Sequence, residues 1–192
     1  MLRVIKWFAV VLGVLVLAFL LTGFLLPSSY AFERSITIQA SPQQIHRFVG
    51  DLQRWPEWTP WAELEPSIQT TYGETTTGVG ASQSWTSDSG GGELTLTRSD
   101  PLSGVDYRMS FDGAFPSDGS IRYEVIPEGT LVTWDMRGEA DNFVGRYLAL
   151  LIESMVGPNY ESGLARLKAL AESEPAMEPA LEEEPGADQA VG

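Results

Sequence analysis

The chain is 192 residues long and 43% hydrophobic, which is enough for one ordinary domain with additional segments. It has no cysteine and a single histidine, so disulfide frameworks, thiolate metal centres and sites built from several histidines are excluded. The formal net charge of −14 argues against binding to nucleic acid, whose phosphate backbone requires clustered lysine and arginine. The sequence therefore predicts no metal site and no cofactor.

A long hydrophobic run follows the first six residues. Residues 7–26 carry no charge, and at 1.5 Å per residue they reach roughly 30 Å, the thickness of one hydrocarbon core. Arg3 and Lys6 precede the run, so the positive-inside rule predicts a single-pass anchor with a cytoplasmic N-terminus and an extracytoplasmic domain. A cleaved signal peptide is the alternative, because Ser29 to Ala31 provides the small residues that a signal peptidase requires.

Charge and composition divide the chain into four segments. Residues 1–26 form the cytoplasmic end and the anchor, 27–32 a linker, 33–171 a folded domain and 172–192 a tail. The tail holds seven acidic residues, no basic residue and several prolines, so it is predicted to be disordered. A solubilising end is the simpler interpretation of the tail, and an acidic docking segment is the alternative.

The predicted domain opens with a strand and a short helix. Residues 33–40 alternate polar and apolar side chains, which indicates a half-buried strand. Ser41 is expected to cap the next helix, with Pro42 in its first turn and Gln44 completing a capping box. Residues 51–61 contain two prolines and three tryptophans, and they predict a compact aromatic corner that seals one end of the core.

The remainder of the domain reads as an antiparallel meander followed by helix. Alternation is clearest in residues 105–112, where one face is apolar and the other polar. Two amphipathic helical segments, 143–156 and 160–172, lie on either side of Pro158, which is expected to kink or interrupt them. One antiparallel sheet and one long helix give an α+β domain in which the sheet curls around the helix. The six predicted meander strands are residues 66–73, 80–87, 93–99, 105–112, 119–126 and 130–138.

This order of elements resembles the helix-grip fold of the START-like superfamily, also called SRPBCC, which includes the birch-pollen-allergen and polyketide cyclase/dehydrase groups. The resemblance covers residues 33–171 and is strongest in the opening strand, capped helix and tryptophan corner. His46 departs from the pattern, because the family often has an aromatic residue there. The matching positions are Ser41, Pro42, Phe48, Val49, Asp51, Leu52, Trp55, Trp58, Trp61, Gly78, Gly80, Trp85, Thr130, Val132, Thr133, Trp134 and the terminal helix 155–172.

The resemblance implies a curved antiparallel sheet of about seven strands wrapped around the C-terminal helix, with an apolar molecule held between them. We therefore expect a membrane-anchored domain that binds a hydrophobic small molecule or a lipid-like ligand without catalysis. Residues 7–26 would hold the domain close to lipid, which raises the effective concentration of both. The predicted ligand-binding residues are Trp85, Tyr107, Met109, Tyr123, Trp134, Leu151 and Met155.

Two other functions are open at this point. An enzyme of the polyketide cyclase/dehydrase type would need an acid–base group facing the cavity, and Asp135 and Glu139 share one face of the last strand. His46 is the one side chain with a near-neutral reference pKa, but no carboxylate partner is evident nearby in the sequence. Solvated carboxylates and a structural histidine are the simpler interpretations. The third possibility is a ligand-free interaction module that recruits a partner through its acidic surface or tail.

Overall fold

The structure, a computed structural model, describes residues 2–113, 116–140 and 143–174. Seven strands form one antiparallel sheet in the spatial order β1-β7-β6-β5-β4-β3-β2. In chain order the elements are α1 (Leu2–Leu25), β1 (Ser29–Ile38), α2 (Pro42–Val49), the 3-10 helix η1 (Leu52–Arg54), α3 (Trp55–Trp58), α4 (Trp61–Leu64), β2 (Gln69–Tyr72), β3 (Ser82–Ser87), β4 (Gly90–Asp100), β5 (Gly104–Phe111), β6 (Ser117–Ile126), β7 (Gly129–Glu139) and α5 (Phe143–Ser173).

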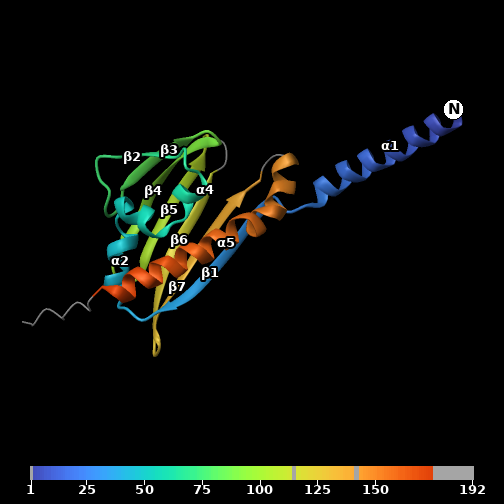
Figure 1. The fold of residues 1–192 in the computed structure, drawn as a ribbon. Coiled ribbons are helices and arrows are strands. Elements are labelled where there is room, and N and C mark those ends of the chain that lie inside the picture. The colour runs from blue at the N-terminus through green and yellow to red at the C-terminus, as the bar shows by residue number, and fades with distance from the viewer. Residues whose placement is uncertain (1, 114–115, 141–142, 175–192) are drawn as a thin grey trace, which may run out of the picture.

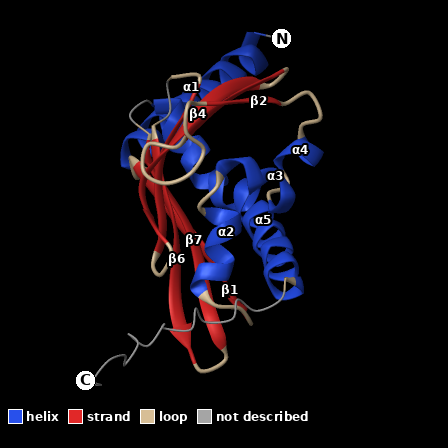
Figure 2. Ribbon diagram, turned by 90° about the vertical axis from the view of Figure 1, so that its left-hand side faces the viewer, coloured by secondary structure: helices blue, strands red, loops and turns tan. Residues whose placement is uncertain are grey.

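The sheet curves, and α5 lies along its inner face (Figure 1). The short helices α2, α3 and α4 gather beside α5 on that same face (Figure 2). The predicted helix-grip arrangement is therefore confirmed, with one strand, a helical insert, six further strands and a long final helix. Three residues, 26–28, link α1 to β1.

The first strand begins earlier than the sequence predicts. Residues 29–32, expected as part of a linker, belong to β1 and pair with β7, beginning at Ser29 opposite Glu139. Phe32 is only 6% exposed and continues the row of inward side chains that ends at Ile38. Burial of Phe32 and the continued ladder together explain the longer strand.

Half of the predicted capping box is present at the start of α2. The Ser41 hydroxyl oxygen accepts a hydrogen bond from the Gln44 backbone N–H at 3.3 Å, as expected. The Gln44 side chain does not return to the cap. It donates instead to the carbonyl oxygens of Ala171 and Glu174, both at 2.8 Å, so that it satisfies the end of α5.

Helix α5 is continuous from Phe143 to Ser173, although Pro158 lies inside it. Arg34 on β1 contacts glutamates on both sides of this proline, Glu153 at 3.2 Å and Glu161 at 2.7 Å. Its guanidinium also packs against Gly157, where a Cβ atom would come within 2.5 Å of an Arg34 nitrogen. Contacts with β1 thus hold the two predicted helical segments in one helix, despite the hydrogen bond that proline removes.

Candidate ligand-binding site

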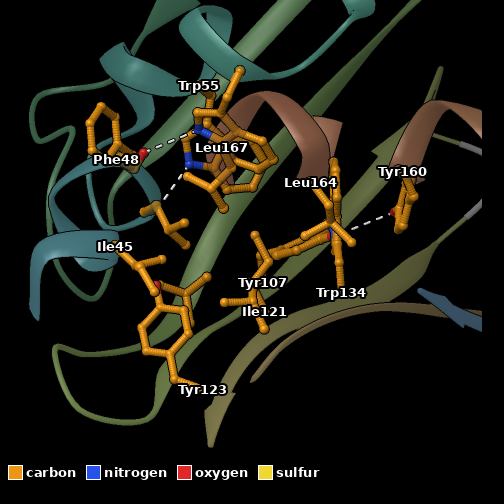
Figure 3. Packing of buried hydrophobic residues seen from close by; sticks show 14 of the residues in the cluster. Ile45, Phe48, Trp55, Tyr107, Ile121, Tyr123, Trp134, Tyr160, Leu164 and Leu167 are labelled. Atoms are coloured by element: carbon orange, nitrogen blue, oxygen red, sulfur yellow. Dashed lines mark hydrogen bonds between the residues drawn. The ribbon is translucent and has the colours of Figure 1, made fainter. Parts of the chain in front are cut away.

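The space between the sheet and the second half of α5 is filled by aromatic side chains (Figure 3). The rings of Trp134 and Tyr160 stack with their centroids 3.7 Å apart, and Trp58 meets Trp134 edge-on at 5.1 Å. The Tyr107 hydroxyl accepts a hydrogen bond from the Trp134 indole N–H at 2.8 Å and lies 3.3 Å from the Tyr160 hydroxyl. All four side chains are at most 2% exposed. This region is a packed core, and Tyr107 and Trp134 belong to it.

Burial makes these tyrosines even harder to ionise than free tyrosine, whose pKa is about 10. It raises the pKa of Tyr107 to about 12, and it raises the pKa of Tyr160 well above the ordinary value. Both hydroxyls remain neutral at physiological pH and well above it. They act as hydrogen-bonding partners within the core, and neither is suited to act as a base.

His46 lies at the α2 end of the same core. Its Nδ1 is 3.4 Å from the Tyr123 hydroxyl, and its Nε2 is 3.2 Å from the Ser99 hydroxyl. Burial lowers the pKa of His46, and the nearby charge of Asp100 partly opposes this effect. Tyr123 is 8% exposed, so this predicted ligand residue is also part of the core.

A hollow of about 520 Å³ opens on the surface beside His46, and Arg47, Asp51 and Arg54 are among its lining residues. Both arginines already pair with Glu174, at 2.7 Å and 3.5 Å. An apolar ligand placed here would have to desolvate the charged groups of Arg47, Asp51 and Arg54, which makes this hollow a poor site for it.

A different part of the inner face is only partly covered. Trp85 on β3 and Met109 on β5 are half-buried, and Phe111 on β5 is 38% exposed. The Trp85 and Phe111 rings meet edge-on at 5.7 Å. Between them lies Gly92 of β4, where a Cβ atom would come within 2.3 Å of the Trp85 ring. We call Trp85, Met109 and Phe111 the inner apolar patch.

Phe111 was not among the ligand residues predicted from the sequence. The signal was present, because the alternation of residues 105–112 already places Phe111 on the same face as Tyr107 and Met109. The last two predicted ligand residues lie on the first half of α5, where Leu151 is 52% exposed and Met155 is 67% exposed. Neither enters the core.

Asp135 and Glu139 lie on the outer face of the sheet, opposite the inner apolar patch. Asp135 accepts a hydrogen bond from the Ser120 hydroxyl, and it lies 3.5 Å from the Arg122 guanidinium and 3.7 Å from that of Arg137. A second hollow, of about 310 Å³, opens over these charged groups. Glu139 is exposed at the end of β7. These carboxylates therefore cannot contact a molecule held between the sheet and α5.

Within the described residues, no group of three or more histidine, aspartate or glutamate side chains is arranged to hold a metal ion. The candidate site consists of the apolar side chains of Trp85, Met109 and Phe111 on the inner face of the sheet. Such a surface binds by burial of apolar area and offers no built acid–base chemistry.

Comparison with solved structures identifies the same fold in several proteins. The di-domain ARO/CYC protein StfQ from the steffimycin biosynthetic pathway matches with a TM-score of 0.56 and 12% identity, covering 75% of this chain and 51% of StfQ. A protein of Nitrosospira multiformis matches with a TM-score of 0.54 and 20% identity, covering 74% of this chain and 97% of that protein. Ara h 8.0201 matches with a TM-score of 0.51 and 15% identity, covering 76% and 99%. At these identities the likeness concerns the fold alone.

No curated protein matches the chain significantly. A family model described as polyketide cyclase / dehydrase and lipid transport matches residues 30–172, which is most of the chain and nearly all of the described domain. The chain therefore belongs to the polyketide cyclase / dehydrase and lipid transport family.

Proposed function

We propose that this protein is a membrane-anchored domain that binds an apolar small molecule or a lipid-like molecule at the inner apolar patch. The observation that carries the proposal is that apolar side chains on the inner face of the sheet are buried in one region and exposed in another. Val105 and Tyr107 of β5 are at most 2% exposed, whereas Phe111 on the same face of the same strand is 38% exposed. Covering the remaining aromatic surface with an apolar ligand is favourable by about 25 cal/mol for each Å² removed from water.

The character of α1 supports the anchor. Residues Lys6–Leu25 have a mean hydropathy of 2.8, and only 6% of the apolar stretch is buried. Figure 1 shows α1 projecting away from the domain. An exposed helix of this length and composition is stable in lipid and unstable in water. Arg3 and Lys6 favour a cytoplasmic N-terminus, with the domain on the other side of the membrane.

An enzymatic function remains the alternative, because StfQ is described as an ARO/CYC protein of a biosynthetic pathway. The geometry gives this alternative less support. Asp135 and Glu139 face away from the inner apolar patch, and the buried hydroxyls of Tyr107 and Tyr160 bond to one another. The interaction module is the other alternative. Of its predicted tail, residues 172–192, the first two belong to α5 and residues 175–192 lie outside the described residues.

Native mass spectrometry of the full chain, released from detergent micelles, tests the proposal with added hexadecanoic acid as the probe. We expect one fatty acid to remain bound. Phe111→Asp should reduce the bound fraction at least tenfold, about the effect of 1.4 kcal/mol or more, because it places a charge against the apolar ligand. Val125→Asp is the matched control, since Val125 is 73% exposed near the opposite end of the sheet. Equal retention by both variants, or no retention by the native sequence, would contradict the proposal.

A further inference from the structure

The first half of α5 has an unusual surface for a helix exposed to water. Residues 143–152 contain one charged residue, Arg146, and no acid. Leu150 and Leu151 are 55% and 52% exposed, and Met155, one turn later, is 67% exposed. A helix on the surface of a soluble domain normally directs polar side chains outward, so this apolar surface requires another explanation.

This part of α5 packs against the last two turns of α1. The Phe19 ring stacks on the Tyr147 ring with centroids 4.5 Å apart and meets the Phe143 ring edge-on at 5.4 Å. The Tyr147 and Thr22 hydroxyls are 2.8 Å apart. Gly23 is buried beneath Phe143, where a Cβ atom would come within 2.0 Å of the ring. The start of α5 is thus directly attached to the proposed anchor.

The contact between α1 and α5 limits the depth at which Leu150 and Leu151 would lie in a bilayer. Phe19 precedes Leu25, the last residue of α1, by six positions, which is about 9 Å along the helix axis. Leu150 and Leu151 follow Tyr147 by only three and four positions, so whatever the direction of α5 they rise at most about 6 Å from Tyr147. If α1 crosses a bilayer up to Leu25, both leucines lie at least about 3 Å below the level of Leu25, on the hydrocarbon side.

The polar side chains at the start of α5 are of the kinds expected at this depth in a bilayer. The Arg146 guanidinium donates to the carbonyl oxygens of Phe24 and Leu26 at 3.3 Å and 3.4 Å, where α1 ends. Arginine and tyrosine are both favoured at the boundary between hydrocarbon and water, where one end of the side chain is apolar and the other is hydrated. Glu153 is the first acid of α5, and it pairs with Arg34 of β1.

We propose that the first half of α5 is a second membrane contact, in which Leu150 and Leu151 insert among the lipid chains of the leaflet where α1 ends. This inference rests on the proposed anchor. The contact is apolar and its one cation is already bonded to α1, so it needs no anionic lipid. It attaches the domain to the bilayer through two helices, α1 and α5.

The absence of native cysteine makes a direct test practical. Single cysteines are introduced into the full chain at exposed positions, labelled with the environment-sensitive fluorophore NBD and reconstituted in phosphatidylcholine vesicles containing spin-labelled lipid as quencher. Leu151→Cys reports the proposed contact, and Val11→Cys, at a position 54% exposed within α1, reports the anchor. Leu102→Cys is the control, because Leu102 is 60% exposed between β4 and β5.

An inserted helix lies about 5–10 Å into the boundary of headgroups and chains, so the label at Leu151→Cys should be quenched at least about threefold more than the label at Leu102→Cys. Strong quenching at Val11→Cys with a solvent-like signal at Leu151→Cys would overturn this inference and leave the anchor intact. Solvent-like signals at both positions would overturn the anchor and the inference together.

Discussion

At the scale of single residues, the hydrogen-bonded side chains of Tyr107, Trp134 and Tyr160 fill the centre of the core and so exclude a ligand from it. Each of these side chains is large and amphipathic, and each is at most 2% exposed. Their polar atoms find partners in one another, so they fill the centre of the domain without leaving donors unsatisfied. A guest molecule would have to displace this network, which explains why the proposed site lies at its margin.

The network makes Tyr107→Phe a sensitive substitution. It removes the oxygen that accepts the Trp134 indole N–H, and we expect it to lower the free energy of unfolding by about 1–3 kcal/mol, the cost of a buried unsatisfied donor. Urea unfolding of the full chain in micelles, followed by near-ultraviolet circular dichroism, measures the change. Tyr72→Phe, at a half-buried position on β2, is the control and should be nearly neutral. A neutral Tyr107→Phe would show that the network does not stabilise the core.

Alkaline pH should weaken the same core. Tyrosine in an unfolded chain has a pKa near 10, whereas burial raises the pKa of Tyr107 to about 12 in the folded protein. Because the folded state holds the proton more tightly, this stabilisation is complete below about pH 10 and is lost as pH rises towards about 12. The free energy of unfolding should therefore fall over that interval, and less steeply in Tyr107→Phe. Equal slopes for the two proteins would exclude a contribution from Tyr107.

At the scale of elements, Gln44 connects the start of the domain to its end. Its side-chain amide donates to the carbonyl oxygens of Ala171, in the last turn of α5, and of Glu174, just after the helix, where the helix dipole is negative. Gln44→Glu replaces the donor with a carboxylate of the same shape. We expect a loss of more than about 1 kcal/mol at neutral pH and a smaller loss below about pH 4, where the carboxyl group is protonated and can donate.

Thermal unfolding at pH 7 and at low pH measures this effect. Gln43→Glu is the matched control, because Gln43 is exposed on the same helix and should tolerate the charge. If both variants lose the same stability, the bond from Gln44 to α5 is not the cause.

The elements that local pattern determines were predicted well. Each of the six meander strands is present within a few residues of its predicted range, because turn residues and period-two alternation are local signals. The errors involve partners distant in sequence. Pro158 was expected to kink or interrupt the helix, but α5 runs through it without interruption, and Arg34 of β1 pairs with glutamates on both sides. Gln44 was expected to complete a local cap, but it bonds to residues more than 120 positions away.

The candidate site was predicted only in part for the same reason. Alternation places Tyr107, Met109 and Phe111 on one face, but it does not indicate where α5 covers that face. Side chains that alternate onto the same face therefore differ in exposure, since Tyr107 is 2% exposed and Phe111 is 38% exposed. Leu151 and Met155 continue an amphipathic helix in the sequence, and only the contact of α5 with α1 suggests that lipid covers them.

At the scale of the whole molecule, α1 and α5 depend on one another. Deleting residues 1–26 removes Phe19 and Gly23, so Phe143 and Tyr147 lose the surface on which they pack. We expect amide hydrogens of residues 143–152 to exchange at least about tenfold faster in the truncated protein, with those of 160–171 unchanged, because the second half of α5 keeps its contacts with the core. Hydrogen exchange with mass spectrometry provides the comparison. Unaltered protection of 143–152 would show that α1 does not stabilise the start of α5.

The three residues between α1 and β1 place a limit on how this protein works. Fully extended, they reach about 10 Å, and Ser28 is already engaged, because its carbonyl oxygen accepts a hydrogen bond from the Ala140 N–H at 2.7 Å. If α1 is embedded in a bilayer as proposed, so short a connection keeps the domain close to the membrane surface and prevents it from moving to a distant compartment. A ligand of a domain anchored in this way would have to reach it by lateral diffusion within the membrane or through the layer of water between the domain and the membrane.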